Sequence, residues 1–219
     1  MKRVFNLVIV DESGSMYTIA KQALAGMNET VETVKSMQKR YPEMEQRLTL
    51  LTFDSDHKTF LLDNAPGARA RSLASSDYHP GGATPLYDAI AMGVNRVNAQ
   101  AAEGDRVLVT IITDGMENCS TDYNLAMIKN LIGKQKAAGW TFALIGTDDL
   151  DVEGMASSMQ MDNRLSFARD EAETQAMFEK LNHCRERYNS YAAINKLMSP
   201  GDFFNDDEDE ALKADKKKK

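Results

Sequence analysis

The chain has 219 residues, of which 42% are hydrophobic and 27% are charged, and its formal net charge is -7 at pH 7. This length fits one domain, or one domain with a tail, and is enough to bury a core without cross-links. The excess of acid argues against an extended nucleic-acid-binding face, which requires a basic surface. Two cysteines exclude a disulfide framework, and no apolar stretch approaches the roughly 18 residues of a membrane span.

The amino terminus superficially resembles a secretory signal, because two basic residues precede an apolar run. Asn6 interrupts that run, Asp11 follows it, and no small-residue cleavage site is present. The segment is better interpreted as a buried first strand. We therefore expect a cytoplasmic protein that does not bind membranes, in which Cys119 and Cys184 are thiols rather than a disulfide.

Strand-like and helix-like segments alternate along the chain. Near-continuous apolar runs indicate strands covered on both faces, and apolar residues spaced three or four apart indicate helices. Pro42, Gly139 and Pro200 mark the ends of helices, and Pro85 favours a helix start. The expected strands are 4–10, 48–53, 59–62, 106–113, 141–146 and 165–168, and the expected helices are 18–40, 67–75, 85–102, 121–138, 150–159 and 171–198.

This alternation predicts an α/β fold, with a Rossmann-like, doubly wound, mostly parallel six-stranded sheet and helices on both faces. Residues 48–62 hold two successive strands separated by a polar turn, which predicts one antiparallel edge strand. Ligands of such sheets bind beyond the carboxyl ends of the strands. Polar residues directly after the first and fourth strands are therefore the first candidates for a functional site.

Three polar loops are expected to meet at that edge. Asp11, Ser13 and Ser15 follow the first strand, Asp114 follows the fourth, and Thr84 lies in the loop between them. Two neighbouring carboxylates repel each other unless a cation lies between them. A set of oxygen donors without Cys or His suits Mg²⁺, with Mn²⁺ or Ca²⁺ also acceptable, and makes a poor zinc site.

The pattern Asp11-x-Ser13-x-Ser15, with a separate Thr84 and a separate Asp114, resembles the metal-ion-dependent adhesion site of von Willebrand factor type A (vWA) domains. All five positions match in the family's order, and the resemblance spans about residues 1–198. The sequence around them is similar to small stand-alone bacterial members. The resemblance implies a vWA fold with an intact metal site.

The resemblance also implies a role for each residue. Ser13 and Ser15 would ligate the metal directly, and Thr84 would do so in a high-affinity state. Asp11 and Asp114 would act mainly through coordinated waters, with Asp114 able to become a direct ligand in a closed state. An Asp or Glu of a protein partner would complete the metal shell.

Residues beside these loops have more ordinary interpretations. Asp88, one turn after Thr84, is expected to make a structural hydrogen bond rather than to ligate the metal. His79 is expected to be a loop residue, with a place at the rim of the site as the alternative. Cys119 is expected to be an inert thiol, because no basic residue adjoins it.

We therefore expect a non-enzymatic, Mg²⁺-dependent protein-binding module whose last helix, 171–198, can shift on binding, as the resemblance implies. An alternative is a Mg²⁺-dependent phosphohydrolase with Asp11 as nucleophile. Against it, Ser13 occupies the position of the expected second acid, and no phosphate-binding lysine is evident. A third hypothesis is an assembly or stress-response component, since some small bacterial members are associated with tellurite resistance.

The domain is expected to span residues 1–198, followed by a charged tail at 199–219. From Asp202 onward the tail holds seven acidic residues and five lysines, arranged as an acidic block and a basic end. This composition predicts a disordered, solubilising segment. The alternative is a docking segment anchored by Phe203 and Phe204.

Overall fold

The fold is built on one six-stranded sheet. A computed structural model describes residues 1–205, and residues 206–219 of the predicted tail lie outside the described residues. The strands are β1 (Lys2–Asp11), β2 (Met44–Phe53), β3 (Lys58–Pro66), β4 (Arg106–Thr113), β5 (Thr141–Thr147) and β6 (Asn163–Phe167). Their order is β3-β2-β1-β4-β5-β6, and only the β2–β3 pair among them is antiparallel. The predicted parallel sheet with one antiparallel edge strand is confirmed.

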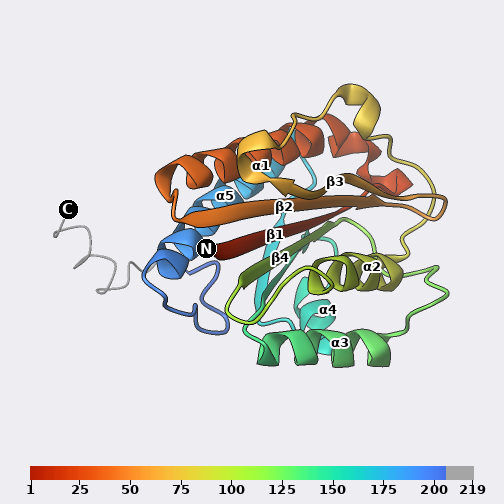
Figure 1. Ribbon diagram of the computed structural model, residues 1–219. Helices are drawn as coiled ribbons and strands as arrows, with labels where there is room; N and C mark the ends of the chain where they lie inside the picture. Colours follow the sequence, from red (N-terminus) through yellow and green to blue (C-terminus); the bar gives the residue numbers. More distant parts are fainter. Residues whose placement is uncertain (206–219) are drawn as a thin grey trace.

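Helices cover both faces of this sheet. They are α1 (Ala20–Arg40), α2 (Leu86–Asn98), α3 (Leu125–Ala137), α4 (Val152–Ser158) and α5 (Glu171–Ala193). One buried apolar cluster joins α1 and α5 to the sheet, and a second joins α2, α3 and α4 to the other face. Figure 1 shows the same division into two helical layers. The doubly wound architecture is therefore confirmed.

Strand β1 explains why the first apolar run is almost continuous. Val4 and Val8 belong to the cluster under α1 and α5, whereas Phe5 and Leu7 belong to the cluster under α2 to α4. Successive side chains of a strand point to opposite faces, so a strand covered on both sides is apolar throughout. Asn6 is the polar exception, and it is buried as well.

Asn6 belongs to a buried polar network under α5, which we call the arginine cluster (Asn6, Gln46, Thr110, Arg185 and Asn189). Arg185 is fully buried, and it donates to Asn6 Oδ1 at 3.0 Å and to Thr110 Oγ1 at 3.3 Å. Asn6 donates to Gln46 Oε1 at 3.2 Å, and Gln46 donates to Asn189 Oδ1 at 2.7 Å. The network ties α5 to three strands.

The loop between β3 and α2 differs from the prediction. A single helix was expected over 67–75, but the structure has two short 3₁₀ turns, Gly67–Arg69 and Ser75–Asp77. Gly67 packs so tightly that a Cβ there would lie 2.8 Å from Gln46 Cβ. This close contact with β2 requires glycine at the start of the segment.

Helix ends also differ from the prediction. Residues Gly14–Ile19 form a 3₁₀ turn before α1, and α3 begins at Leu125 with Asn124 as its N-cap, not at 121 or 122. Helix α2 ends at Asn98 rather than near 102, and α5 ends at Ala193 rather than 198. All six strands and five of the six expected helices are present, so apart from the segment 67–75 the errors lie at the boundaries of the elements.

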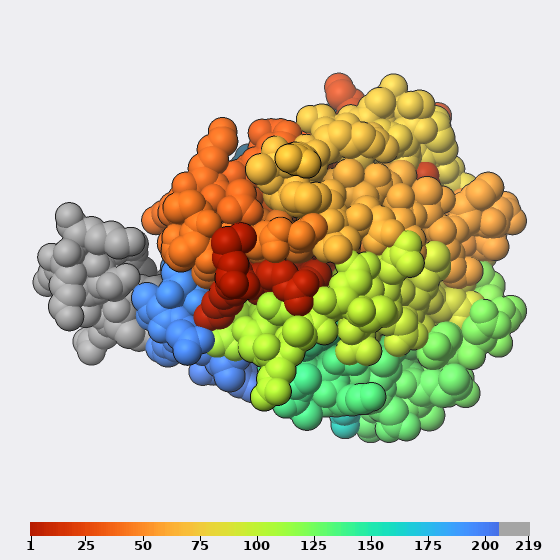
Figure 2. All heavy atoms as spheres, in the orientation of Figure 1, coloured from red at the N-terminus to blue at the C-terminus, as the bar shows by residue number. Residues whose placement is uncertain are grey.

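The chain continues to pack on the domain after α5. Phe203 is fully buried, its N–H donates to Asn163 Oδ1 at 2.9 Å, and Arg187 Nη2 donates to its carbonyl at 2.8 Å. Ordered packing thus extends past the expected boundary at 198. Lys2 Nζ donates to the carbonyl of Ala192 at 2.8 Å, and Figure 2 shows the amino terminus (red) beside the last described residues (blue).

Two expectations about composition have structural counterparts. Cys119 and Cys184, both within the described residues, form no disulfide, as predicted. Across residues 1–205, none of the helices combines the length and apolar character that crossing a bilayer requires.

Candidate metal centre

The carboxyl ends of β1 and β4 lie side by side at the centre of the sheet. Val10 is paired with Ile112, so the residues that follow them, Asp11 and Thr113, emerge at the same edge. Asp114 comes next in the chain, and Thr84 arrives there just before α2. The parallel register therefore brings the three predicted loops together.

Asp11 forms the base of the site and is completely buried. Its Oδ1 accepts a hydrogen bond from the Ser13 N–H at 2.7 Å, and its Oδ2 accepts one from Thr113 Oγ1 at 2.6 Å. The first bond folds the Asp-x-Ser turn back on itself, and the second joins β1 to β4. The orientation of the carboxylate is therefore set from both sides.

A chain of side-chain oxygens runs from the first loop to the third. Ser13 Oγ and Ser15 Oγ are 3.2 Å apart, and Ser15 Oγ donates to Asp114 Oδ1 at 2.6 Å. Thr84 completes the set from the second loop. A Cβ added to Gly115 would lie 2.8 Å from Thr84 Oγ1 and 3.6 Å from Asp11 Oδ2, so only glycine leaves room for this approach.

Backbone contacts hold the three loops in register. Gly14 N–H donates to the Gly82 carbonyl at 3.1 Å. Asn118 Oδ1 accepts from Thr84 N–H at 2.9 Å, and Asn118 N–H donates to the Thr84 carbonyl at 3.2 Å. Asn118 thus ties the Thr84 loop to the Asp114 loop. Sequence reasoning missed it, because a polar residue four positions after an aspartate carries no distinctive signal.

Asp88 has the structural role that the sequence predicted. Its carboxylate accepts hydrogen bonds from the backbone N–H groups of Thr121 at 3.0 Å, Asp122 at 3.1 Å and Tyr123 at 2.9 Å. These bonds hold residues 121–123 in a non-helical loop, which is why α3 starts later than predicted. His79 is an exposed loop residue whose backbone N–H donates to Glu12.

The electrostatics of the two carboxylates show that the site carries unbalanced negative charge. Burial raises the pKa of Asp11 to about 6, hydrogen bonds from Thr113 and Ser13 oppose the rise, and Asp114 adds to it. Burial also raises the pKa of Asp114, opposed by the hydrogen bond from Ser15 and by Arg169. Within residues 1–205, Asp11 has no ion-pair partner.

Arg169 is the second residue that sequence reasoning missed. It lies just before α5, and its Nη2 donates to the Asp114 carbonyl at 2.9 Å and to Asp149 Oδ2 at 3.1 Å. Its Nε is 3.4 Å from Asp114 Oδ2. The two residues are 55 positions apart in the chain, so no local pattern connects them.

The donor set fits a hard divalent cation. It combines two buried carboxylates with three hydroxyls, and the Asp114 oxygen that joins this set is Oδ1, because Oδ2 lies 3.4 Å from Arg169 Nε. In the described part of the chain no group of three His, Cys, Asp or Glu side chains is arranged to hold a metal. A cation here would therefore depend on the hydroxyl oxygens, which suit Mg²⁺ and exclude a typical zinc site.

The site is open on its outer side. Ser15 is exposed, whereas Asp11, Ser13 and Thr84 are buried. Two large hydrophobic side chains flank the opening in sequence, Tyr17 with 77% and Met116 with 62% of its surface exposed. Each lies two residues along the chain from one member of the hydrogen-bonded Ser15–Asp114 pair, and we call Tyr17 and Met116 the rim residues.

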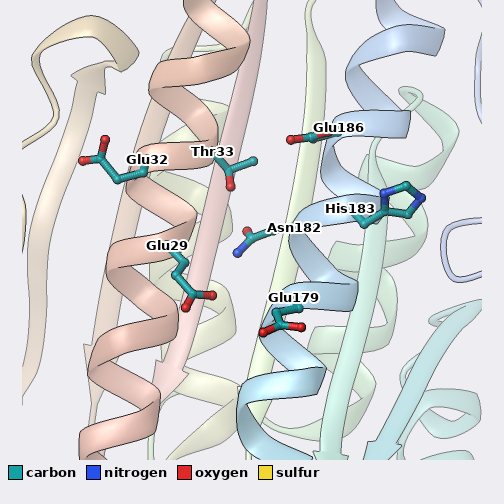
Figure 3. A pocket seen from close by; sticks show the side chains of 7 residues that line it. All are labelled: Glu29, Glu32, Thr33, Glu179, Asn182, His183 and Glu186. Carbon is teal, nitrogen blue, oxygen red and sulfur yellow. The ribbon is translucent and has the colours of Figure 1, made fainter.

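A separate cleft lies between α1 and α5, with a volume of about 430 Å³. Figure 3 shows its lining side chains, which come from these two helices. They are Glu29, Glu32, Thr33, Glu179, Asn182, His183 and Glu186. None of the five predicted metal-site residues is among them, so this cleft is distinct from the candidate metal centre.

Comparisons of the sequence find no matching family model and no matching curated protein. Solved structures do match. The pilus adhesin SpaC from Lactobacillus rhamnosus GG has a TM-score of 0.66 and 14% identity over 87% of this chain and 30% of SpaC. The vWF domain of the pilus tip protein Mfa5 from Porphyromonas gingivalis has a TM-score of 0.64 and 12% identity over 85% of this chain and 96% of that domain.

The SpRpn10 VWA domain is a third match, with a TM-score of 0.57 and 11% identity over 82% of this chain and 94% of that domain. The chain spans less than a third of the length of SpaC but nearly all of the two isolated domains. At these identities the likeness concerns the fold. The chain has the fold of vWA domains, as its resemblance to that family implied.

Proposed function

We propose that the chain is a metal-dependent protein-binding module, in which a Mg²⁺ ion at the candidate metal centre bridges to an acidic side chain of a partner protein. The main support is the convergence of two buried carboxylates and three hydroxyls at the carboxyl end of the sheet. A cation would neutralise carboxylates that burial otherwise makes costly to ionise.

Each residue has a distinct part in this proposal. Ser13, Ser15 and Thr84 supply hydroxyl oxygens to the cation, and Asp11 and Asp114 hold its coordinated waters. When bound, the cation supplies the local positive charge that an otherwise acidic chain lacks. The hydrogen bonds from Thr113 and Ser13 to Asp11 keep its carboxylate oriented before a partner arrives.

A protein partner is supported by the rim of the site. Tyr17 and Met116 expose large apolar surfaces two residues along the chain from Ser15 and Asp114, and such surfaces near a polar site favour a macromolecular contact. The matched folds include a pilus adhesin and a pilus tip protein, which accords with a binding role. We propose that the partner presents an Asp or Glu to the metal, and that an apolar part of it covers the rim.

We propose binding rather than catalysis. In the alternative phosphohydrolase mechanism Asp11 would attack phosphorus, but both of its oxygens accept hydrogen bonds and its side chain is completely buried. A nucleophile needs a free oxygen within reach of its substrate. The burial and hydrogen bonding of Asp11 therefore disfavour its direct attack on a substrate.

The test is affinity capture from a lysate of the source organism with the wild-type chain, in Mg²⁺ and in EDTA. We expect capture only in Mg²⁺, release by EDTA, and loss of capture by Asp11→Asn. The matched control is Asp148→Asn, which removes the same charge from an exposed residue that the site does not use. Capture that survives both EDTA and Asp11→Asn would contradict the proposal.

A further inference from the structure

The two carboxylate oxygens of Asp114 have different surroundings. Oδ1 faces the candidate metal centre, where it accepts the 2.6 Å hydrogen bond from Ser15. Oδ2 faces Arg169, whose Nε is 3.4 Å away. Asp114 therefore presents one oxygen to the site and turns the other toward a fixed positive charge.

Arg169 is itself held in place. Its Nη2 donates to the backbone carbonyl of Asp114 at 2.9 Å and also to Asp149 Oδ2 at 3.1 Å. The bond to the carbonyl places the guanidinium against the loop that carries the carboxylate, and Asp149 holds it from the other side. The flat, forked guanidinium can make these contacts together, which a lysine ammonium cannot do with the same geometry.

We propose that Arg169 is a specificity-determining residue of the metal centre, because it withholds one oxygen of Asp114 from the bound cation. This inference rests on the proposed function and adds to it a preference for Mg²⁺ over Ca²⁺. Mg²⁺ takes six ligands and favours one oxygen from each carboxylate, whereas Ca²⁺ takes six to eight and often uses both oxygens of a carboxylate.

Without the guanidinium, Oδ2 of Asp114 becomes free to turn toward the site and add a ligand. An additional oxygen favours the larger cation. Removing a positive charge also strengthens the binding of any cation, but Mg²⁺ and Ca²⁺ carry equal charge. The ratio of their dissociation constants therefore cancels most of the charge effect and reports the change in available oxygens.

The experiment is calorimetric titration of the metal-free, full-length chain with MgCl₂ and with CaCl₂. For Arg169→Gln we expect both affinities to rise and the preference for Ca²⁺ relative to Mg²⁺ to increase about tenfold over the wild type. Arg169→Lys keeps the charge but loses the fork, so it should shift the ratio in the same direction while both affinities stay nearer the wild type. If Arg169→Gln fails to fold, Arg169→Lys decides by the same ratio.

The matched control is Arg164→Gln on β6, which removes an arginine paired with Glu153 at 2.6 Å on the surface. It should leave both dissociation constants unchanged. A ratio that Arg169→Gln leaves unaltered, or that Arg164→Gln shifts equally, overturns the inference while the proposed metal site stands. A wild-type chain that binds neither cation overturns the proposed metal site, and the inference with it.

Discussion

Two buried polar clusters lie against the same sheet and carry opposite charges. The metal-site cluster (Asp11, Ser13, Ser15, Thr84 and Asp114) lies at the carboxyl ends of the strands, and the arginine cluster lies under α5. Among the described residues, Asp11 has no basic partner and Arg185 has no acidic one. Burial disfavours the charged form of both, since it raises the pKa of Asp11 to about 6 and lowers the pKa of Arg185 to about 10.

The two clusters differ in access to solvent. In the arginine cluster Arg185, Gln46 and Asn189 are all fully buried, and Arg185 gives both terminal nitrogens to protein acceptors. Each cluster holds one buried polar atom without a hydrogen-bond partner, Arg185 Nε and Asp114 Oδ2, but in the metal-site cluster Ser15 is exposed. The enclosed arginine cluster can meet its charge only with neutral hydrogen-bond acceptors of the protein, whereas the metal-site cluster can take an ion from solution. Buried charge alone therefore does not mark a binding site.

The largest expected effect on stability comes from a substitution in the arginine cluster, which is closed to solvent. Arg185→Ala should lower the free energy of unfolding by about 3–5 kcal/mol, because it leaves a cavity and deprives Asn6 of a buried donor. Arg185→Met, which fills the same space without charge, should lose less than Arg185→Ala. Urea denaturation measures both. The control Arg164→Ala breaks only a surface ion pair and should cost less than about 1 kcal/mol.

If Arg185→Ala costs no more than Arg164→Ala, the arginine cluster does not hold α5 on the sheet. If Arg185→Met costs as much as Arg185→Ala, the hydrogen bonds outweigh the filled volume. In the first case the arginine cluster contributes less to stability than its burial indicates. In the second case its contribution comes mainly from hydrogen bonds rather than from packing.

In the metal-site cluster, which is open to solvent, removing the charge should stabilise the metal-free chain instead of destabilising it. Asp11→Asn should raise the free energy of unfolding of the metal-free chain at pH 7 by about 1–3 kcal/mol, because it removes a buried charge whose pKa is raised to about 6. The same variant should lose its stabilisation by Mg²⁺. Denaturation with and without Mg²⁺ measures both effects. A variant that is less stable than the wild type without metal would show that the Asp11 carboxylate is structural.

The pH dependence of the metal-free chain tests the same charge by a smaller effect. Folded Asp11 holds its proton up to a pH of about 6, above the ordinary aspartate value of 3.8. Between these two values the folded state binds more protons than the unfolded state. The free energy of unfolding should therefore rise by roughly 1 kcal/mol as the pH falls from 7 to 5. Asp11→Asn should lack this rise, which the difference between the two melting profiles reveals.

In saturating Mg²⁺ the wild-type chain should lose stability, rather than gain it, as the pH falls from 7 to 5. Protons compete with a cation for the carboxylates, so stabilisation by the metal should be greatest above pH 6 and decline as the pH falls through that value. If stabilisation by Mg²⁺ stays constant from pH 7 to 5, the Asp11 carboxylate does not take part in binding the metal.

The strands and the residues of the metal-site cluster could both be predicted from the sequence, because both follow from the pattern of a buried parallel sheet. A strand buried on both faces must be apolar along its length, so β1 was recognisable from Val4 to Val10. The parallel arrangement then places residue 11 beside residue 113. Both inferences need only local patterns and the rule that strands of such sheets are parallel.

What the sequence did not reveal depends on contacts between distant residues. Arg169 reaches Asp114 from 55 positions away, and Asn118 acts through a backbone contact with Thr84. The late start of α3 follows from the binding of three backbone N–H groups by Asp88. The arginine cluster was missed for the same reason, because Arg185 on α5 looks like an ordinary surface arginine until the helix is placed on the sheet.

The smallest expected effect concerns the rim of the open cluster, and it separates binding from stability. Tyr17→Ser and Met116→Ser should change the free energy of unfolding by less than about 0.5 kcal/mol, because both side chains are exposed. The dissociation constant of Mg²⁺ should also stay unchanged, since neither side chain supplies a metal ligand. Affinity for the captured partner should nevertheless fall about tenfold in each variant, as expected for an apolar anchor at an interface.

The control Leu197→Ser removes a hydrophobic side chain, 54% exposed, from the segment that follows α5. It should not affect capture. If Leu197→Ser weakens partner binding as much as Tyr17→Ser does, the effect is general surface stickiness and the rim has no special role. If only the rim variants weaken it, the open cluster is an interface in which the metal supplies charge and the rim supplies apolar contact.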